Sequence, residues 1–235
     1  MENIKKIKYF TGLESVEMEL IKLYMIKKTL DKGEMLLVEG KWSDYLYFVI
    51  SGMLKIFKSA PNGKEQILRI ATAGDSVNDV SSFDHRPSVA SMIAMNKVTL
   101  YAISRNDLGI LMHQSNNLCM NIIQSLASRI RHDSTLVEEL SSYQAITRLA
   151  KLLNGKHAGE ETSVGLFLIQ QDIGGMIGAS REVVNRSLKI IEKRGAIRLK
   201  PHQVEIINKN LLSEIAEEYD DTDQGYPERA HKILV

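Results

Sequence analysis

The sequence of 235 residues predicts an α+β fold, with a small all-β roll in its N-terminal half and helices after it. Two changes of pattern indicate this division. Between residues 30 and 104, glycines separate short apolar runs, which is typical of strands joined by turns. After Ile103, apolar residues recur at steps of three and four, which is typical of helices.

Three apolar runs, at residues 46–50, 54–57 and 66–70, are the clearest predicted strands. The last two flank the turn sequence Pro61-Asn62-Gly63-Lys64. Asn-Gly between apolar runs favours a hairpin, because both residues tolerate a positive φ. Several such units predict a closed roll or barrel.

Residues 107–112 predict a short helix and residues 116–142 a long one. A helix of about 27 residues spans roughly 40 Å, which is more than one small domain easily covers. Its apolar seam favours a coiled-coil homodimer, although packing of the seam on the chain's own roll is an alternative. The carboxylate of Asp133 interrupts this seam and needs a charged partner, water or a polar ligand. The predicted dimer interface comprises Cys119, Ile123, Leu126, Ile130, Val137 and Leu140.

Several chemistries are not expected. Cys119 is the single cysteine, so the chain alone forms no internal disulfide, four-thiolate zinc site or cysteine-ligated iron–sulfur cluster. It is either a buried apolar residue or a reactive thiol. The sequence has no glycine-rich phosphate loop, HExxH motif or nucleophile motif, so we predict no catalytic residue, no metal site and no enzyme.

The net charge of +1 conceals two regions of opposite sign. Residues 143–212 hold 11 Lys and Arg against 6 Asp and Glu, whereas residues 213–235 hold 2 against 7. The basic region is either a polyanion-binding surface or an ordinary solvated one. Apolar runs are too short for a membrane span and no signal-peptide pattern is present, so we expect a cytoplasmic protein without a membrane partner.

The basic region predicts a winged helix-turn-helix. One apolar helix face ends at Asn154-Gly155, and a strand-like run follows at residues 164–169. Gly178 then separates two short helices, and Ser180 is placed to cap the second one. Residues 196–199 and 203–207 predict a hairpin, and residues 210–219 a closing helix.

The second short helix carries side chains that suit base edges. Arg pairs with guanine, Glu accepts from cytosine and Asn pairs with adenine. The alternative is a surface helix with local ion pairs. The predicted base-reading residues are Arg181, Glu182, Asn185 and Arg186, behind the cap Ser180, and the predicted phosphate contacts are Lys189, Lys193, Lys200 and His202.

Over about residues 10–212 the chain resembles the family of the cyclic AMP receptor protein and the fumarate and nitrate reduction regulator, the Crp/Fnr family. The resemblance lies in Lys32-Gly33-Glu34, Glu39-Gly40, residues 46–52, Gly63-Lys64-Glu65, Ala73-Gly74-Asp75 and the Ser-Arg-Glu of the second short helix, followed by three residues and Arg.

This resemblance implies an N-terminal cyclic-nucleotide-binding-like β-roll (a double-stranded β-helix), at residues 1–114. A dimerisation helix at 115–142, a winged helix-turn-helix at 143–219 and an acidic tail at 220–235 would follow. It also implies an allosteric transcription regulator that binds double-stranded DNA at a TGTGA-like inverted repeat and contacts RNA polymerase. Asn185 departs from the small residue of the cyclic AMP branch, which changes the expected reading of the middle of each half-site.

The resemblance implies a small-molecule effector but not cyclic AMP. Where the cyclic AMP branch has Gly-Glu and Arg-Ser pairs, this chain has Asn78-Asp79 and Ser88-Val89, so the phosphate-binding arginine is missing. Arg86 lies two positions away, and Pro87 opposes a simple shift. An oxygen-sensing iron–sulfur cluster is excluded, because the N-terminal cysteines are absent.

Arg129 and Asp133, one helical turn apart, are further effector candidates; the alternative is that they pair with each other. His85 is either a haem ligand or a solvated loop residue. We expect the effector to bias a rotation about residues 140–144 and so the spacing of two recognition helices. The alternative function is a ligand-binding module that controls another protein without binding DNA.

Overall fold

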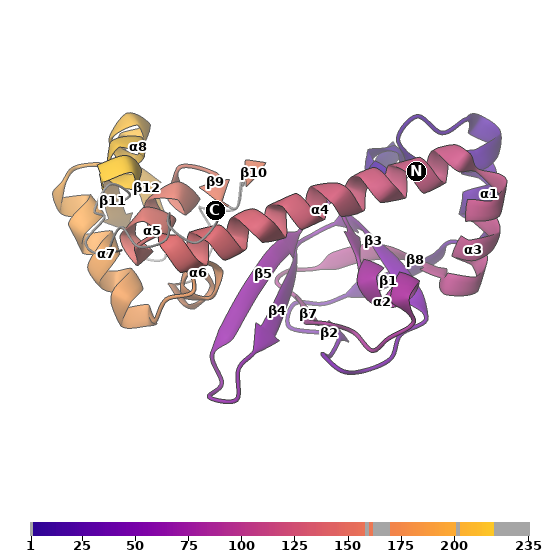
Figure 1. Cartoon of the computed structure of the whole chain (residues 1–235), viewed down its shortest axis with the longest axis horizontal. Helices are drawn as coiled ribbons and strands as arrows, with labels where there is room; N and C mark the ends of the chain where they lie inside the picture. The colour runs from indigo at the N-terminus through magenta and orange to yellow at the C-terminus, as the bar shows by residue number, and fades with distance from the viewer. Residues whose placement is uncertain (1, 158–159, 162–169, 201–202, 219–235) are drawn as a thin grey trace, which may run out of the picture. The chain divides into compact units, whose positions relative to one another are not determined.

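The computed structural model describes residues 2–157, 160–161, 170–200 and 203–218 (Figure 1). The chain forms two compact units, Met1–Arg131 and His132–Val235. Among the described residues, no helix combines the length and the apolar character needed to cross a bilayer. The predicted strand-like run at residues 164–169 and the acidic tail at 220–235 lie outside the described residues.

The first unit contains two four-stranded antiparallel sheets, which confirms the predicted roll. One sheet has the order β1 (Ile26–Leu30), β8 (Val98–Ser104), β3 (Tyr45–Ser51) and β6 (Ser76–Val77). The other has the order β2 (Met35–Leu37), β7 (Ser91–Ala94), β4 (Leu54–Ser59) and β5 (Glu65–Ala71). Neighbouring strands are mostly distant in sequence, so local patterns predict the strands but not their order.

Strand β3 explains why its sequence is apolar throughout. Val49 and Tyr47 join the core between the two sheets, while Leu46 and Phe48 point to the other side. There the rings of Tyr9 and Phe10 pack on Phe48, with centroids 5.6 and 4.9 Å away. Because both faces are covered, the polar alternation of a half-exposed strand is absent.

Short helices cover this outer face of the roll. They are η1 (Glu2–Lys6), η2 (Lys8–Phe10), α1 (Ser15–Leu23), α2 (Asp79–Asp84) and α3 (Arg105–Gln114). Helix α4 (Asn116–Ser142) follows, with the bounds that the sequence predicts. Its buried residues Leu118 and Ile122 join the same core as Phe48. Helix α3 is longer than the predicted 107–112, because Ser104 caps it by accepting the N–H of Asp107.

The Asn-Gly hairpin between β4 and β5 is confirmed, but its turn differs from the prediction. Only Gly63 of the turn has a positive φ, +78°. The Gly63 N–H donates to Ala60 O at 2.9 Å, and the Ala60 N–H donates to Lys64 O at 2.8 Å. One left-handed residue after an ordinary turn closes a three-residue loop, so Asn62 does not need a positive φ.

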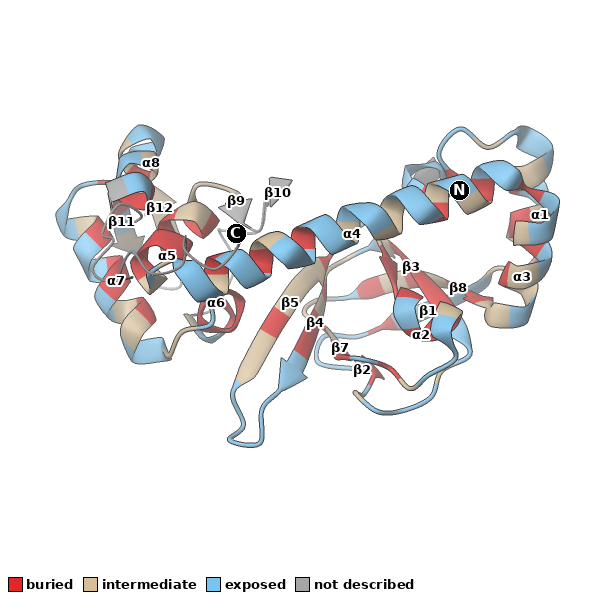
Figure 2. Ribbon diagram, in the orientation of Figure 1, coloured by how far each residue is buried: buried red, intermediate tan, exposed pale blue. Residues whose placement is uncertain are grey.

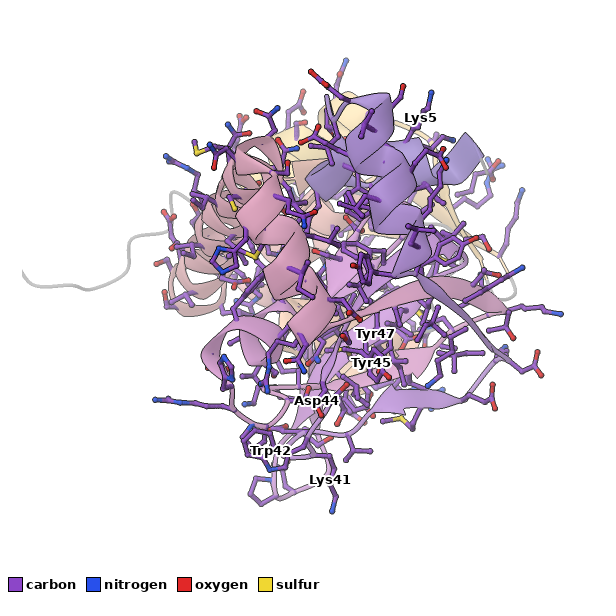
Figure 3. All side chains as sticks on the ribbon, turned by 90° about the vertical axis from the view of Figure 1, so that its right-hand side faces the viewer. Lys5, Lys41, Trp42, Asp44, Tyr45 and Tyr47 are labelled. Carbon is purple, nitrogen blue, oxygen red and sulfur yellow. The ribbon has the colours of Figure 1, made fainter. Side chains whose placement is uncertain are left out.

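Aromatic residues gather at the loop before β3 and the start of β3, where Trp42 is exposed and Tyr47 is buried (Figure 3). Trp42, the chain's single tryptophan, is 66% exposed in the loop before β3. The ring centroids of Tyr45 and Tyr47 lie 6.2 Å apart, and Lys28 Nζ lies 5.9 Å from the Tyr47 ring. Tryptophan fluorescence therefore reports on this surface of the roll.

The second unit confirms the predicted winged helix-turn-helix. Helices α5 (Ala145–Leu153), α6 (Gln170–Ile177), α7 (Arg181–Lys193) and α8 (Lys209–Glu218) surround a core in which Leu149, Ile177, Val184, Ile191 and Leu212 are fully buried. Strands β11 (Ile197–Lys200) and β12 (Gln203–Ile206) form the antiparallel wing. A further antiparallel pair is β9 (Lys156–His157) with β10 (Glu160–Glu161).

The chain passes from one sheet of the roll to the other at Gly52, and this crossing requires glycine. Its φ is +90°, and an added Cβ would lie 2.4 Å from Lys97 O. Gly63 also has a positive φ, +78°, but a Cβ added there would meet nothing within 4 Å. A side chain at Gly63 would therefore meet only the strain of a positive φ, whereas one at Gly52 would meet that strain and a steric collision.

We predict that Gly52→Ala lowers the free energy of unfolding by about 1–3 kcal/mol more than Gly63→Ala, because only Gly52→Ala adds a collision to the strain of positive φ. Urea unfolding followed by Trp42 fluorescence measures both values. Equal destabilisation by the two substitutions would contradict the close approach of Lys97.

Candidate nucleic-acid interface and effector site

The turn between α6 and α7 is built from small residues. Gly178 has a φ of +63°, and Ser180 caps α7 by accepting the Val183 N–H at 3.4 Å. The sequence does not single out Gly174, although a Cβ there would lie 2.8 Å from Ala179 O. The Gly-Gly pair inside α6 was the available signal, since glycine within a helix often marks a close approach.

Helix α7 separates its packing residues from its polar ones. Its buried residues are Val184, Ser187, Leu188 and Ile191. Its N-terminus is capped by the Ser180 hydroxyl. Among the predicted base-reading residues, Arg181, Glu182 and Arg186 are exposed and Asn185 is partly exposed. The predicted phosphate contacts Lys189 and Lys193 are also exposed. The helix therefore presents a polar, mainly cationic face from its first turns.

The wing carries its own ion pairs. Lys200 Nζ lies 3.0 Å and Arg198 Nη1 3.5 Å from the carboxylate of Glu205. Glu192 of α7 accepts the Leu199 N–H at 2.7 Å, which ties the wing to α7. A phosphate contact by Lys200 would replace its Glu205 partner. His202 lies outside the described residues.

Arg148 is a buried residue that the sequence does not single out, with 8% exposure. Its Nε–H donates to Ile177 O, the last residue of α6, at 2.7 Å, and Nη1 donates to Glu139 O at 3.3 Å and to Tyr143 O. Burial lowers the pKa of this guanidinium, and Glu139 opposes that effect. The cation thus occupies the carbonyl ends of two helices, where helix dipoles favour positive charge.

In the first unit, the structure brings together two predicted effector residues, Asp79 and Arg129. Arg129 Nη1 forms an ion pair with Asp79, whose side chain is fully buried, and the Tyr9 hydroxyl donates to the same carboxylate. Burial alone would raise the pKa of the Asp79 carboxyl. The charges of Arg129 and Arg69, together with the hydrogen bonds from Ser76 and Tyr9, outweigh burial and hold this pKa below the ordinary value. Burial, reinforced by Asp79, raises the pKa of Tyr9.

Within the described part of the chain, the other predicted effector residues make no hydrogen bond or salt bridge with this ion pair, and several bond elsewhere. Pairing of Arg129 with Asp133, the predicted alternative, is wrong: Asp133 is exposed, and Arg129 turns toward the buried carboxylate of Asp79. The amide of Asn78 donates to Tyr45 O at 2.8 Å, and the Ser88 hydroxyl donates to Ala90 O at 2.9 Å. The exposed residues of this group include Val89 and, at the end of α2, His85.

The predicted seam of α4 is only partly covered by the chain itself. Ile123, Ile130 and Val137, spaced seven residues apart, are 56%, 67% and 66% exposed. Much of α4 is exposed along its length (Figure 2). Leu126 and Leu140 are partly buried, and Leu126 packs against the roll's outer core. Cys119 is a free, partly buried thiol whose Sγ lies 3.2 Å from Met112 O. An exposed apolar stripe with a seven-residue repeat therefore runs along α4.

Comparisons with known proteins give a consistent result. Residues 27–115 match the cyclic nucleotide-binding domain, and residues 147–215 match the Crp-like helix-turn-helix domain. The chain is 30% identical over 209 residues to the cyclic AMP receptor protein of Thermus thermophilus, covering 88% of this chain and 95% of that protein.

A second relative is the CRP-like cAMP-activated global transcriptional regulator of Mycobacterium tuberculosis, which is 29% identical over 87% of this chain and 94% of its own length. Among solved structures, a transcriptional regulator of the crp/fnr family from Eubacterium rectale has a TM-score of 0.74 at 19% identity. That alignment covers 91% of this chain and 99% of the other. At this identity the structural match supports the fold.

We predict that Arg148→Met lowers the free energy of unfolding of the second unit by about 1–3 kcal/mol for each buried carbonyl that loses its donor. Circular dichroism during urea unfolding measures the change. The control is Lys151→Met, in the same helix, which removes a cation 3.4 Å from the Tyr143 ring and should cost about 1 kcal/mol or less. If both variants unfold alike, Arg148 does not tie the helix ends together.

Proposed function

The chain belongs to the Crp/Fnr family of DNA-binding transcription regulators, and from this premise we propose that it acts as an effector-controlled homodimer on a TGTGA-like inverted repeat. The observation that carries the proposal is the exposed Arg181, Glu182 and Arg186 at the start of α7, directly after a glycine turn. A recognition helix inserts its N-terminal residues into the major groove, where these side chains suit guanine and cytosine edges.

Homodimer formation is supported by the exposed stripe on α4. β-branched residues occupy every seventh position, Ile123, Ile130 and Val137. Leu126 and Leu140 follow the first and the last of them by three residues, and Asp133 takes the corresponding position after Ile130. This combination favours two-stranded parallel coiled coils. A parallel pair would present two α7 helices, as an inverted repeat requires.

The roll is proposed to hold the effector, as a cyclic nucleotide-binding domain suggests. Cyclic AMP itself is not the proposed ligand, because Ser88-Val89 replaces the Arg-Ser pair. Effector binding would change DNA affinity only through a difference in affinity for two states of the dimer. We further propose, from family resemblance, contact with RNA polymerase in the cytoplasm.

The base-reading role predicts that Arg181→Ala and Arg186→Ala each weaken binding to a TGTGA inverted-repeat duplex by about tenfold to a hundredfold, because each removes a bidentate base contact. Fluorescence anisotropy at fixed salt against a scrambled duplex measures the preference. Lys189→Ala is the comparison: loss of a phosphate contact should weaken binding to both duplexes equally. A preference that survives both arginine substitutions would refute base reading by these two residues, and a wild type that binds neither duplex would favour a module that controls another protein without binding DNA.

The seam role predicts that Ile123→Glu converts the homodimer to a monomer, because it places a charge at the core of the interface. Size-exclusion chromatography with light scattering gives the mass. Gln124→Glu adds the same charge to an exposed neighbouring position and should leave the dimer intact. A monomeric wild type, or a dimeric Ile123→Glu variant, would refute this interface.

A further inference from the structure

Two arginines from different elements meet inside the roll. Arg69 of β5 donates from Nη2 to the carbonyl oxygen of Ser76 at 2.6 Å. Arg129 of α4 donates from Nη2 to the same oxygen at 3.4 Å and to Ser76 Oγ at 3.3 Å. Because two guanidinium groups share one acceptor, two positive charges lie side by side between β5 and α4.

The nearby carboxylates make their direct contacts with groups other than Arg69. Asp79 is already engaged by Arg129 and by the Tyr9 hydroxyl. Asp75 forms an ion pair with Lys8 at 3.4 Å and accepts the Thr72 N–H at 2.8 Å. Within the described part of the chain, no carboxylate lies within ion-pair distance of Arg69.

A further anion in contact with Arg69 would stabilise this arrangement. Burial, and then the charge of Arg129, lower the pKa of Arg69, but an arginine remains protonated in proteins. Asp79 and Asp75 attract the Arg69 charge, but neither carboxylate lies within ion-pair distance, so Arg69 lacks the Coulomb attraction of a direct ion pair. An anion placed against both guanidinium groups would supply that attraction.

Neither arginine is fully buried. Arg69 is partly exposed, and the side chain of Arg129 is 20% exposed. A guanidinium offers five N–H donors in a planar fork, of which Arg69 uses one in its bond to Ser76. Carboxylate and phosphate groups match such a fork with two parallel hydrogen bonds.

We propose that the effector carries a carboxylate or phosphate group and that Arg69 and Arg129 bind it. The inference rests on the proposed effector function of the roll and names the chemical class of the ligand. It differs from the position that resemblance assigns to a cyclic phosphate, because Ser88 lies in another loop and donates to Ala90 O. Since Arg129 belongs to α4, the bound anion would join β5 to the proposed dimerisation helix.

The test uses inorganic phosphate as the probe and the full chain without DNA. Isothermal titration calorimetry compares phosphate binding by wild type with Arg69→Met, at constant ionic strength in chloride. Loss of the paired hydrogen bonds from the Arg69 guanidinium group should weaken phosphate binding by about tenfold or more. Phosphate should also raise the melting temperature of wild type by more than that of Arg69→Met, because a ligand stabilises only a protein that binds it.

Matched variants separate this site from other effects of phosphate. Phosphate stabilises folded proteins in general, because it is excluded from their surface. The control is therefore Arg105→Met, which removes a partly exposed arginine paired with Asp44. This variant should bind phosphate as wild type does. The double variant Arg181→Ala, Arg186→Ala should also retain binding, which excludes the recognition helix as the phosphate site. If Arg69→Met fails to fold, Arg69→Lys keeps the charge, loses the fork and should still bind more weakly than wild type.

Two results would overturn the proposal. One is wild-type phosphate affinity in the Arg69 variants, or no binding by wild type. The other is an equal rise in melting temperature with phosphate in wild type and in Arg69→Met, which would give Arg69 a purely structural role through Ser76. Neither result depends on DNA, so loss of this site would leave the proposed DNA recognition standing, and loss of DNA recognition would leave this site standing.

Discussion

Helix α4 carries two sets of apolar side chains, and the rest of the structure depends on keeping both sets from water. Leu118 and Ile122 are buried on the roll, whereas Ile123 and Val137 remain more than half exposed. Burying each such side chain stabilises by about 1.5–3 kcal/mol, so a second copy gains considerably by covering the stripe. The same helix ends at Ser142, and α5, the first helix of the winged helix-turn-helix, begins at Ala145.

Charged side chains attach α4 within each unit. In the first unit, Arg129 joins α4 to the buried Asp79, which also holds the N-terminal segment through Tyr9. In the second unit, Arg148 links Glu139 O of α4 to Ile177 O, at the turn before the recognition helix. A ligand that changes the first attachment would act on the helix that also carries the second. This is the physical route by which we propose that effector binding alters DNA affinity.

Local signals explain what the sequence predicted well. Gly178 and Ser180 define the helix-turn-helix, Asn62-Gly63 defines a hairpin, and the seven-residue spacing defines α4 with its bounds. Contacts between distant residues could not be predicted in the same way. Helical spacing pointed from Arg129 to Asp133, four residues away, but the actual partner Asp79 is brought close only by the fold of the roll.

The mass of the protein–DNA complex is the decisive measurement for paired recognition helices. Sedimentation equilibrium on a duplex with two TGTGA half-sites, one helical turn or about 34 Å apart, gives the number of chains bound. We expect two chains of 26.5 kDa on each duplex and a dimer of the same composition without DNA. One chain on each duplex, from a protein that is monomeric in solution, would contradict the proposed dimer.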